Sequence, residues 1–432
     1  MNYTYPMELK YHKFTLPNGI RVFMVPKKES RAVLVEVAFG VGSRYEDKEN
    51  EGIAHFMEHM VFKGTKKRPT SLDITKNIDQ VGGLWNAFTA SEVTGYHIQL
   101  QSEKIELAFD ILSDMIINSK IDEKELKKEK GVILEEYKMK LDNPDIFAAI
   151  KFNELAYGDT PLGRFGIGTN ETIKSMDRKK IIDFSRKFYN PDNMVIAIGG
   201  NINQEKTKKL LKKYFGKIKG ETKEKFEKNN IIQKSPLIQI HKKDNKQAIV
   251  MMGFRSFGRG NKKRYIREII LKALGGYMSS RLHIDVREKK GLAYAIYSWI
   301  DVFQEVGFLG IVGGFDPKKV SEALKEIFKI LRGIKKNGFA PSEVNMAKEN
   351  SVGRLILSLE GAGGWAEDIA INDLFGLPIE TPDEIIKKTN KVTNADIKRL
   401  AREIFRPENF NMVIVGPIES KEEKKYLDLV KL

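Results

Sequence analysis

The feature that most constrains this chain is a sequence pattern that occurs twice. Residues 181–200 (IIDFSRKFYNPDNMVIAIGG) resemble residues 397–416 (IKRLAREIFRPENFNMVIVG), and Pro191 and Pro407 are offset by 216, half of the 432 residues. Each copy reads as a helix, a turn with an x-Pro-x-Asn motif and a buried strand. A common helix–turn–strand unit can recur by chance, but the shared turn and the half-length offset favour a duplication. We therefore expect two large domains of similar fold.

The length and a polar segment near the middle agree with this division. A chain of 432 residues exceeds what one hydrophobic core usually supports. Residues 216–236 (GKIKGETKEKFEKNNIIQKSP) are polar, charged and end in proline, which is typical of a linker. The expected organisation is an N-terminal domain over residues 1–216, a linker over residues 217–236 and a C-terminal domain over residues 237–432.

Hydrophobic periodicity in the first half predicts strands and helices in mixed order. The expected strands form a hairpin over residues 13–26 around an Asn-Gly turn and single strands over 31–41, 86–100 and 193–199. The expected helices cover residues 52–62, 71–80 with Ser71 as the N-cap, 103–118, 124–141, 179–189 and 203–215.

The helix over residues 52–62 (GIAHFMEHMVF) is apolar almost all round, which is typical of a buried helix. Burying imidazoles or carboxylates without partners is unfavourable. His55 and His59 are four residues apart, on one helix face, and Glu58 lies between them. This is the H-x-x-E-H pattern, in which two imidazoles bind zinc and the carboxylate handles the proton of a water. The alternative is a pair of core histidines that hydrogen-bond to the backbone or to Glu58.

The equivalent stretch of the second half lacks this chemistry. Residues 267–275 (REIILKALG) keep the apolar character but contain no histidine, so we expect the metal site in the first half alone. The chain has no cysteine, and any zinc must therefore use histidine and carboxylate ligands.

A tetrahedral catalytic zinc needs a third protein ligand and one open position. The helix over residues 124–141 offers carboxylates next to its apolar side, which we expect to contain Leu126, Val132, Ile133, Leu134 and Tyr137. At about 100° per residue, Glu129 and Glu136 fall on or beside that side, whereas Glu135 points to solvent. Glu136 is the better ligand and Glu129 suits a role in orienting a ligand. Helical geometry alone equally allows both to be edge carboxylates paired with lysines.

The motif and its surroundings resemble the pitrilysin family of zinc peptidases, which includes mitochondrial processing peptidase and insulin-degrading enzyme. The matching strings are AHFMEHMVFKGT, GGLWNAFTASEVTGY and EKGVILEEYKMKLDNP, and the 77 residues from His59 to Glu136 equal the family's spacing. The resemblance implies that His55, His59 and Glu136 bind one zinc ion (Zn2+) per chain. The resemblance also implies that Glu58 is the general base on zinc-bound water. It implies that Glu129 is the family's second acidic residue of the helix over residues 124–141.

The resemblance also implies roles for residues outside the motif. Arg287 and Tyr294 match an arginine and tyrosine pair that the family brings to the zinc site, where they suit holding carbonyls and stabilising an oxyanion. Without the resemblance, Arg287 reads as a surface cation. Asn86, Ala87, Phe88 and Thr89 match an edge strand that binds substrate backbone by strand addition. An ordinary internal strand fits those four residues equally well.

The fold that the resemblance implies is α+β, with two homologous domains, each a mainly antiparallel sheet with helices packed on one face. The implied function is a zinc-dependent endopeptidase that hydrolyses unfolded peptides in an enclosed chamber. Family members of this length are half-size and commonly pair, so we expect a homodimer, with a heterodimer of homologous subunits as the alternative. A non-catalytic peptide-binding or scaffold subunit is the alternative function, against which the intact motif argues.

The net charge of +16 raises a third function, nucleic-acid binding. The lysines are distributed through mixed-charge helices such as residues 120–140, which is typical of a solvated surface, so no nucleic-acid partner is expected. The first 14 residues contain no apolar core of a signal peptide, and no apolar run reaches membrane-spanning length. We therefore expect a cytoplasmic protein with no membrane partner.

Overall fold

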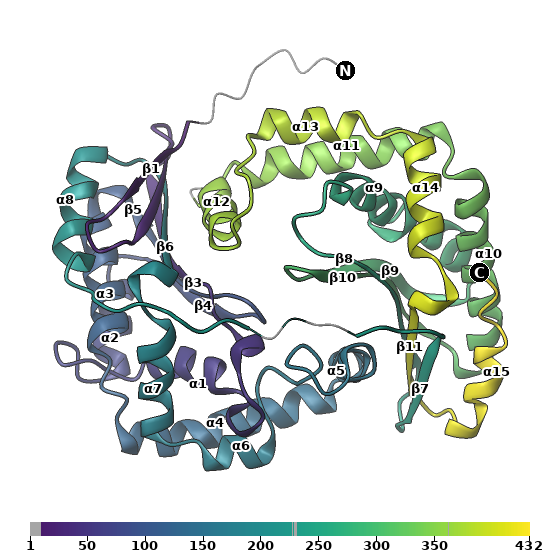
Figure 1. The fold of residues 1–432 in the computed structure, drawn as a ribbon, viewed down its shortest axis with the longest axis horizontal. Coiled ribbons are helices and arrows are strands. Elements are labelled where there is room, and N and C mark those ends of the chain that lie inside the picture. Colours follow the sequence, from purple (N-terminus) through teal and green to yellow (C-terminus); the bar gives the residue numbers. More distant parts are fainter. Residues whose placement is uncertain (1–9, 227, 229–230, 362) are drawn as a thin grey trace. The chain divides into compact units, whose positions relative to one another are not determined.

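The structure is a computed structural model that describes residues 10–226, 228, 231–361 and 363–432. Most of its helices and strands are labelled in Figure 1. The chain forms two compact units, each assembled from three segments. The first unit comprises Met1–Lys138, Phe165–Glu227 and Ile356–Pro382; the second comprises Met139–Arg164, Lys228–Leu355 and Asp383–Leu432.

The first unit contains a six-stranded sheet in the order β1-β2-β6-β3-β5-β4. Its strands are β1 (His12–Thr15), β2 (Arg21–Pro26), β3 (Ala32–Phe39), β4 (Leu84–Thr89), β5 (Thr94–Gln101) and β6 (Met194–Gly200). Neighbouring strands are antiparallel except β2 and β6, which are parallel. Strand β4 is at one end of this order and is therefore an edge strand.

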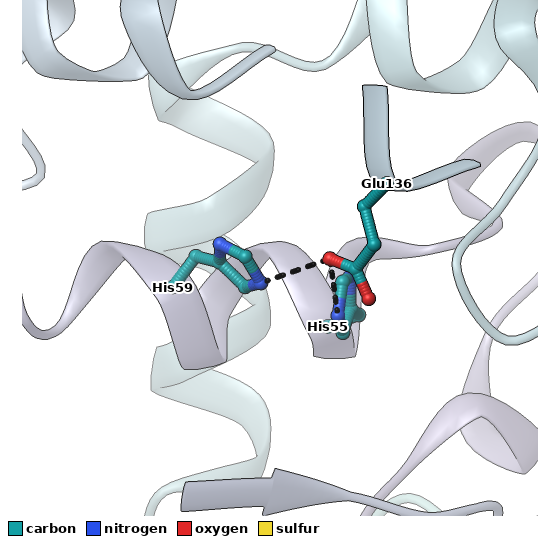
Figure 2. A group of neighbouring side chains, drawn as sticks. All are labelled: His55, His59 and Glu136. Carbon is teal, nitrogen blue, oxygen red and sulfur yellow. Dashed lines mark ion pairs between the residues drawn. The ribbon is translucent and has the colours of Figure 1, made fainter. Parts of the chain in front are cut away.

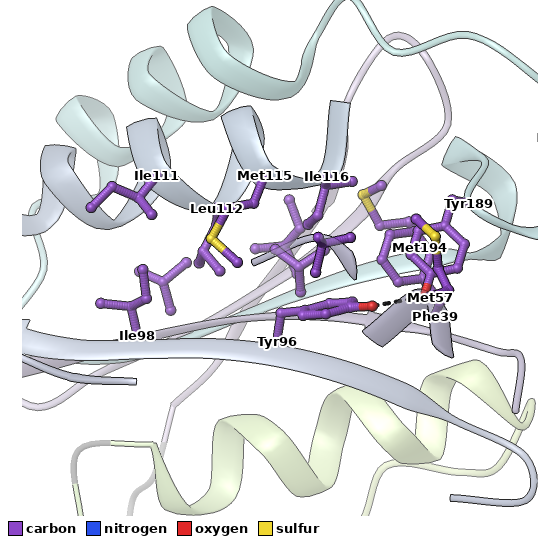
Figure 3. Close-up of a cluster of buried hydrophobic side chains, with 14 of the residues drawn as sticks. Phe39, Met57, Tyr96, Ile98, Ile111, Leu112, Met115, Ile116, Tyr189 and Met194 are labelled. Carbon is purple, nitrogen blue, oxygen red and sulfur yellow. Dashed lines mark hydrogen bonds between the residues drawn. The ribbon is translucent and has the colours of Figure 1, made fainter. Parts of the chain in front are cut away.

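Helices from the first half of the sequence pack against one face of this sheet. They are α1 (Ile53–Met60), α2 (Ser71–Asp79), α3 (Ile105–Asn118), α4 (Glu123–Asp142), α6 (Asn170–Ser175), α7 (Arg178–Phe188) and α8 (Gln204–Phe215). Alternate residues of the strands pack against these helices. Figure 3 shows Tyr96 and Ile98 of β5 in one buried cluster with Leu112 and Met115 of α3 and Met57 of α1.

The opposite face of the sheet is covered by a helix from the other half of the sequence. This helix, α12 (Gly364–Leu374), contacts β6, β2 and β3. Trp365 and Ile369 pack there against Phe23 and Val25, which alternate along β2 with the residues that face the main core.

The second unit contains a five-stranded sheet in the order β7-β11-β8-β10-β9. Its strands are β7 (Leu237–Lys242), β8 (Ala248–Phe257), β9 (Ala293–Val302), β10 (Val306–Phe315) and β11 (Phe410–Gly416). Strands β7 and β11 are parallel and the other neighbours are antiparallel. Its helices are α9 (Arg264–Gly275), α10 (Val320–Asn337), α11 (Pro341–Ser358), α13 (Pro382–Asn390), α14 (Asn394–Ile404) and α15 (Glu423–Leu427), with a π-helix at His283–Glu288.

One face of this second sheet is covered by α5 (Pro144–Tyr157), a helix from the first half of the sequence. It contacts β11, β8 and β7, and its Phe152 and Tyr157 pack against Phe308 and Val413. Helices α5 and α12 thus have equivalent positions, because β11 of the second sheet corresponds to β6 of the first.

Five strands of the first sheet match the five strands of the second in order, and only β1 has no counterpart among the described strands, which supports the duplication. The order β2-β6-β3-β5-β4 corresponds to β7-β11-β8-β10-β9, and the parallel pair occurs at the same place in both. The expected α+β class with mainly antiparallel sheets is therefore confirmed. Helices were expected on one face of each sheet, and the structure adds a helix on the opposite face.

The expected domain boundaries differ from the compact units in two segments. Residues 139–164 lie in the second unit and residues 356–382 in the first, whereas the sequence predicts contiguous halves joined by a linker. The physical reason is that each sheet has a second apolar face, which α12 or α5 buries.

Two local predictions are wrong. Thr70 rather than Ser71 is the N-cap of α2, and it forms a reciprocal capping box with Asp73. The strand expected over residues 86–100 is a hairpin of β4 and β5, closed by a hydrogen bond from the Ala90 N–H to the Val93 carbonyl at 2.9 Å. Within the described residues, no helix combines the length and apolar character needed to cross a membrane.

Candidate metal centre

The position of α1 is fixed at its N-terminus. Gly52 has φ +89°, and a Cβ there would lie 2.1 Å from the Ile167 carbonyl oxygen, so the close contact requires glycine. The Glu46 carboxylate accepts hydrogen bonds from the N–H groups of Gly52 (2.7 Å) and Ala54 (2.9 Å). A carboxylate at this end also interacts favourably with the helix dipole.

His55 and His59 lie beside one another on α1, with ring centroids 4.5 Å apart. Helix α4 places Glu136 against both rings, as Figure 2 shows. Oε2 of Glu136 is 3.7 Å from Nε2 of His55 and 3.6 Å from Nε2 of His59. All three residues are partly buried, so their ligand atoms share one partly enclosed space.

These separations fit a zinc ion. They are longer than ordinary hydrogen bonds. Ligand atoms about 2.0–2.2 Å from a tetrahedral zinc lie roughly 3.3–3.5 Å from one another, which is close to the two distances observed. Two imidazole nitrogens and one carboxylate oxygen also suit zinc chemically and leave a fourth position for water or substrate. The side chains present therefore fit the metal.

Glu129 is on the same face of α4 as Glu136 and contacts the ring nitrogen of His59 that does not face Glu136. Nδ1 of His59 is 2.8 Å from Oε1 of Glu129, and Nζ of Lys63 is 2.7 Å from Oε2. Burial alone raises the pKa of Glu129, but hydrogen bonds from His59 and Lys63 outweigh it and hold the pKa below its usual value. The ionised carboxylate accepts the Nδ1 proton of His59 and so leaves Nε2 available to a metal.

Glu58 lies in the same helix, near a buried pair of tyrosines. The hydroxyl groups of Tyr96 and Tyr189 are 2.8 Å apart. Burial, then the neighbouring Tyr189 and the charge of Glu58 raise the pKa of Tyr96 far above its usual value. Both hydroxyls therefore remain protonated beside Glu58.

Glu135 and Glu136, two neighbouring glutamates of α4, have different surroundings. Glu135 is 73% exposed and pairs with Lys138 at 2.7 Å, whereas Glu136 faces the two histidines. The expectation for Val132 is wrong, since this side chain is 52% exposed rather than part of the inward face. Sequence reasoning missed Glu46 and Lys63. The sequence marks them only as charged residues shortly before and after α1.

Asn86, Ala87, Phe88 and Thr89 lie on β4, the edge strand of the first sheet. One side of β4 pairs with β5, and no described strand pairs with the other side. Helix α1 contacts this strand, so the candidate substrate strand is next to the helix that contains His55 and His59.

Arg287 and Tyr294 lie close together in the second unit, whereas the three candidate ligands belong to the first unit. The guanidinium carbon of Arg287 is 5.9 Å from the ring centroid of Tyr294, and Nη1 of Arg287 is 3.2 Å from Nε2 of His283. Tyr294 is 75% exposed, so its hydroxyl group is accessible to a ligand.

Comparisons with known proteins agree on one kind of protein. Residues 21–170 match the family model described as insulinase (peptidase family M16), and residues 175–351 match the model described as peptidase M16 inactive domain. The chain is 35% identical over 411 residues to the uncharacterized zinc protease YmxG of Bacillus subtilis, covering 94% of this chain and 98% of that one. An uncharacterized zinc protease of Mycobacterium leprae is 33% identical over 411 residues, with 94% and 92% covered.

Solved structures show the same similarity. The crystal structure of a protease from Helicobacter pylori has a TM-score of 0.90 at 25% sequence identity and covers 95% of this chain and 100% of that chain. An M16 inactive domain from Pseudomonas fluorescens, at 19% identity and a TM-score of 0.88, shares the fold. The motif histidines and Glu136 all fall within the first of the two matched regions, residues 21–170.

Proposed function

The chain belongs to the insulinase family of peptidases, family M16, and on this premise we propose that it is a zinc-dependent endopeptidase acting on unfolded peptides. The observation that carries the proposal is the convergence of three ligand atoms. Nε2 of His55 and Nε2 of His59 lie 3.7 and 3.6 Å from the same oxygen of Glu136.

In this proposal His55, His59 and Glu136 would hold a zinc ion, which when bound would supply polarisation of the scissile carbonyl and a lowered pKa of a water molecule. Glu58 accepts the proton of the attacking water and later delivers it to the leaving amine, the role of a general base that becomes a general acid. Glu129 keeps His59 in the tautomer and orientation that present Nε2.

The edge strand β4 supports a proposal for substrate binding. An extended peptide can pair its backbone with Asn86–Thr89, and backbone pairing depends little on side-chain sequence. A folded protein has few free strand edges to offer, so unfolded peptides are the proposed substrates. Arg287 and Tyr294 are proposed to hold substrate carbonyls and to donate a hydrogen bond to the oxyanion.

We propose that two half-size chains pair around a chamber, as a homodimer or with a homologous subunit. A second candidate function is a non-catalytic peptide-binding or scaffold subunit of such a pair. It is favoured by the match of residues 175–351 to a domain described as inactive. The candidate metal ligands lie outside that region, which supports the catalytic proposal over this one.

The test is peptide cleavage by the wild type and by Glu58→Gln, with zinc content measured for both. We expect the wild type to bind zinc and cleave members of a varied peptide library. The Glu58→Gln variant should keep its zinc and lose hydrolysis by about 100-fold or more, because proton transfer typically contributes 10²–10⁴-fold. Glu49→Gln, at an exposed glutamate shortly before α1, is the matched control and should behave as the wild type.

Two results would contradict the peptidase proposal. One is a zinc-loaded wild type that cleaves no member of the library, alone or mixed with a homologous subunit. The other is Glu58→Gln with undiminished hydrolysis.

A further inference from the structure

A second group of metal-ligating side chains lies in the first unit, on the sheet face that α12 covers. Glu36 of β3 is directly opposite His97 of β5 in the antiparallel register, so both side chains leave the sheet on the same face. Glu367 of α12 reaches the same place. One ligand atom from each of the three residues lies within 4.8 Å of the others.

This group is separate from the H-x-x-E-H site. Successive residues of a strand point to opposite faces, and Tyr96, the residue before His97, packs in the main core with α1 and α3. His97 therefore faces the other side of the sheet, toward α12. The two groups share no residue.

The group holds buried polar atoms that lack partners. Glu36 is 2% exposed, and its Oε1 is buried without a hydrogen-bond partner in the described part of the chain. Nδ1 of His97 is likewise buried without a partner there. Burying a polar atom without a partner is unfavourable, and here two such atoms belong to one group of metal-ligating side chains, which favours a bound ligand.

Negative charge at this place also lacks a counter-charge. Asp368, the next residue of α12, adds an exposed carboxyl group at the edge of this group, and partial desolvation followed by the charge of Glu367 raises the pKa of Asp368. Three cations of the first unit pair with other carboxylates: Lys27 with Glu360, and Lys13 and Arg21 with Asp373. No lysine or arginine of the described ranges forms an ion pair with Glu36, Glu367 or Asp368. Buried carboxylates require a proton or a cation.

We propose that Glu36, His97 and Glu367 bind a divalent transition-metal ion, with zinc as the best match. A donor set of two carboxylates and one imidazole suits zinc, whereas magnesium and calcium prefer oxygen ligands alone. Ligand atoms within 4.8 Å need to move by only about 1 Å to reach the separations around a tetrahedral ion. Flexible glutamate side chains allow such a movement.

A proton shared by the carboxyl groups is the competing explanation. Burial, followed by the adjacent Glu367, raises the pKa of Glu36 to about 8 in the metal-free protein, so this pair can retain one proton. That proton offers nothing to Nδ1 of His97, which stays unpartnered. A metal ion would satisfy one atom from all three side chains.

The role of this metal is structural. Glu36 and His97 belong to the N-terminal half of the sequence, whereas Glu367 belongs to α12 from the C-terminal half. Gly363 precedes α12, and a Cβ there would lie 2.8 Å from the Leu34 side chain and 3.1 Å from Oε2 of Glu367. The glycine allows α12 to approach the sheet closely. The metal would then cross-link α12, which comes from the C-terminal half of the sequence, to β3 and β5.

The test is the zinc content per chain, measured by mass spectrometry after dialysis against metal-free buffer. We expect two zinc ions in the wild type, one in His97→Ala, one in His55→Ala and none in the double variant. His241→Ala removes a half-buried histidine from β7 of the second unit and is the matched control, which should keep two. Added zinc should raise the thermal unfolding temperature of His55→Ala but not of the double variant.

A second variant guards against loss of zinc through misfolding. Glu367→Gln keeps the size of the side chain on α12 and should also lose one zinc while its circular dichroism spectrum stays that of the wild type. The proposal is overturned if the wild type holds one zinc that His55→Ala loses, or if His97→Ala and Glu367→Gln both keep two. Loss of zinc from His55→Ala bears on the catalytic proposal and loss from His97→Ala on this one, so the two can fail separately.

Discussion

Glu129 connects a candidate metal ligand to the protein around it. Its two oxygens contact Nδ1 of His59 and Nζ of Lys63, and all three side chains belong to the first unit. Such partners of metal ligands fix the ring orientation and increase ligand basicity. At the scale of single residues, the site therefore depends on a group that does not touch the metal.

We expect Glu129→Gln to weaken zinc binding at the His55–His59 site by about 10- to 100-fold, because the amide holds the imidazole less strongly than a carboxylate. The measurement is the zinc dissociation constant from competition with a chelator. Glu125→Gln is the control, since Glu125 is one turn earlier on α4 and pairs with Lys128. Equal zinc affinity in the two variants and the wild type would argue against this role.

Some residues of the site were accessible from sequence and others were not. The spacing of His55 and His59 on a helix and the angle that distinguishes Glu136 from Glu135 are local properties, which periodicity reveals. Lys63 and Glu46 act through partners that only the folded chain brings near. Helix geometry predicts which way a side chain points, but not which charged group it meets.

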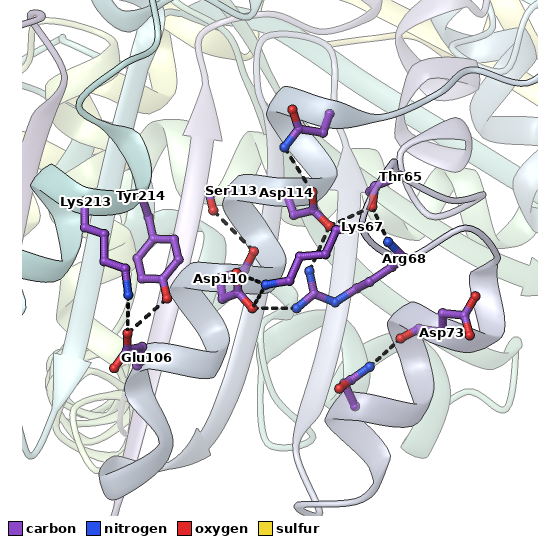
Figure 4. A network of polar contacts seen from close by, with 12 residues as sticks. Thr65, Lys67, Arg68, Asp73, Glu106, Asp110, Ser113, Asp114, Lys213 and Tyr214 are labelled. Atoms are coloured by element: carbon purple, nitrogen blue, oxygen red, sulfur yellow. Dashed lines mark hydrogen bonds and ion pairs between the residues drawn. The ribbon is translucent and has the colours of Figure 1, made fainter.

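At the scale of elements, the segment that follows α1 is tied to α3 by a buried charge cluster, which Figure 4 shows. Arg68 donates to Asp114 at 2.8 Å and to Asp110 at 2.6 Å, and the Thr65 hydroxyl donates to Asp114 at 2.6 Å. Arg68 is 7% exposed. The cluster fixes the path of the chain out of the metal helix.

We expect Arg68→Met to lower the free energy of unfolding by roughly 3–5 kcal/mol, because two carboxylates lose their buried partner. Lys67 pairs with the same Asp110 but is 59% exposed, so Lys67→Met should lower it by less than about 1 kcal/mol. Urea unfolding of both variants provides the measurement. Similar losses in the two would show that burial of the arginine is unimportant.

The same cluster predicts a pH dependence. Burial by itself raises the pKa of Asp110, but hydrogen bonds from Lys67 and Arg68 outweigh it and hold the pKa below its usual value. A lowered pKa in the folded state contributes stability above the unfolded pKa, and this stability is lost as the pH falls through the folded pKa. We expect Asp110→Asn to be less stable than the wild type at pH 7 and to lose less stability between about pH 5 and pH 3.

Urea unfolding at a series of pH values measures this difference. Asp79→Asn, at an exposed aspartate at the end of α2, is the control and should follow the wild-type pH profile. Parallel profiles for wild type and Asp110→Asn would contradict the assignment.

The elements that sequence reasoning missed have physical causes. The turn between β4 and β5 contains no glycine or proline, and the alternation continues through it. The turn is held by long-range contacts instead: the Arg44 N–H donates to the Ser91 carbonyl at 2.8 Å, and the Arg44 side chain pairs with Glu92. Thr70 was overlooked because Ser71 is an equally good capping residue by type.

At the scale of the whole molecule, the duplication is visible in the sequence, but the exchange of two helices between the halves is not. In this exchange α5 of the N-terminal half packs in the second unit and α12 of the C-terminal half packs in the first. The repeated helix–turn–strand pattern predicted two similar sheets, and their strand orders agree. The family expected from the H-x-x-E-H motif and its flanking strings is confirmed by the match of residues 21–170. Periodicity shows that a helix has an apolar side, but it does not show which sheet that side covers.

The exchange predicts that neither half of the sequence folds stably alone. Residues 1–216 lack α12, so they would expose Phe23, Val25 and Val195, and their α5 would have no sheet to cover. We expect this fragment to aggregate or bind a hydrophobic dye, and to become soluble when residues 237–432 are co-expressed. A fragment 1–216 that is soluble alone and unfolds cooperatively would contradict the exchange.

The most direct test of the central claim compares two adjacent glutamates. Glu136→Gln and Glu135→Gln make the same chemical change at neighbouring positions of α4, one facing the histidines and one facing solvent. The measurement is peptide hydrolysis together with zinc content. We predict that Glu136→Gln holds one zinc fewer than the wild type and loses hydrolysis, whereas Glu135→Gln keeps both. Full zinc content and full hydrolysis in Glu136→Gln would contradict a peptidase centre built from His55, His59 and Glu136.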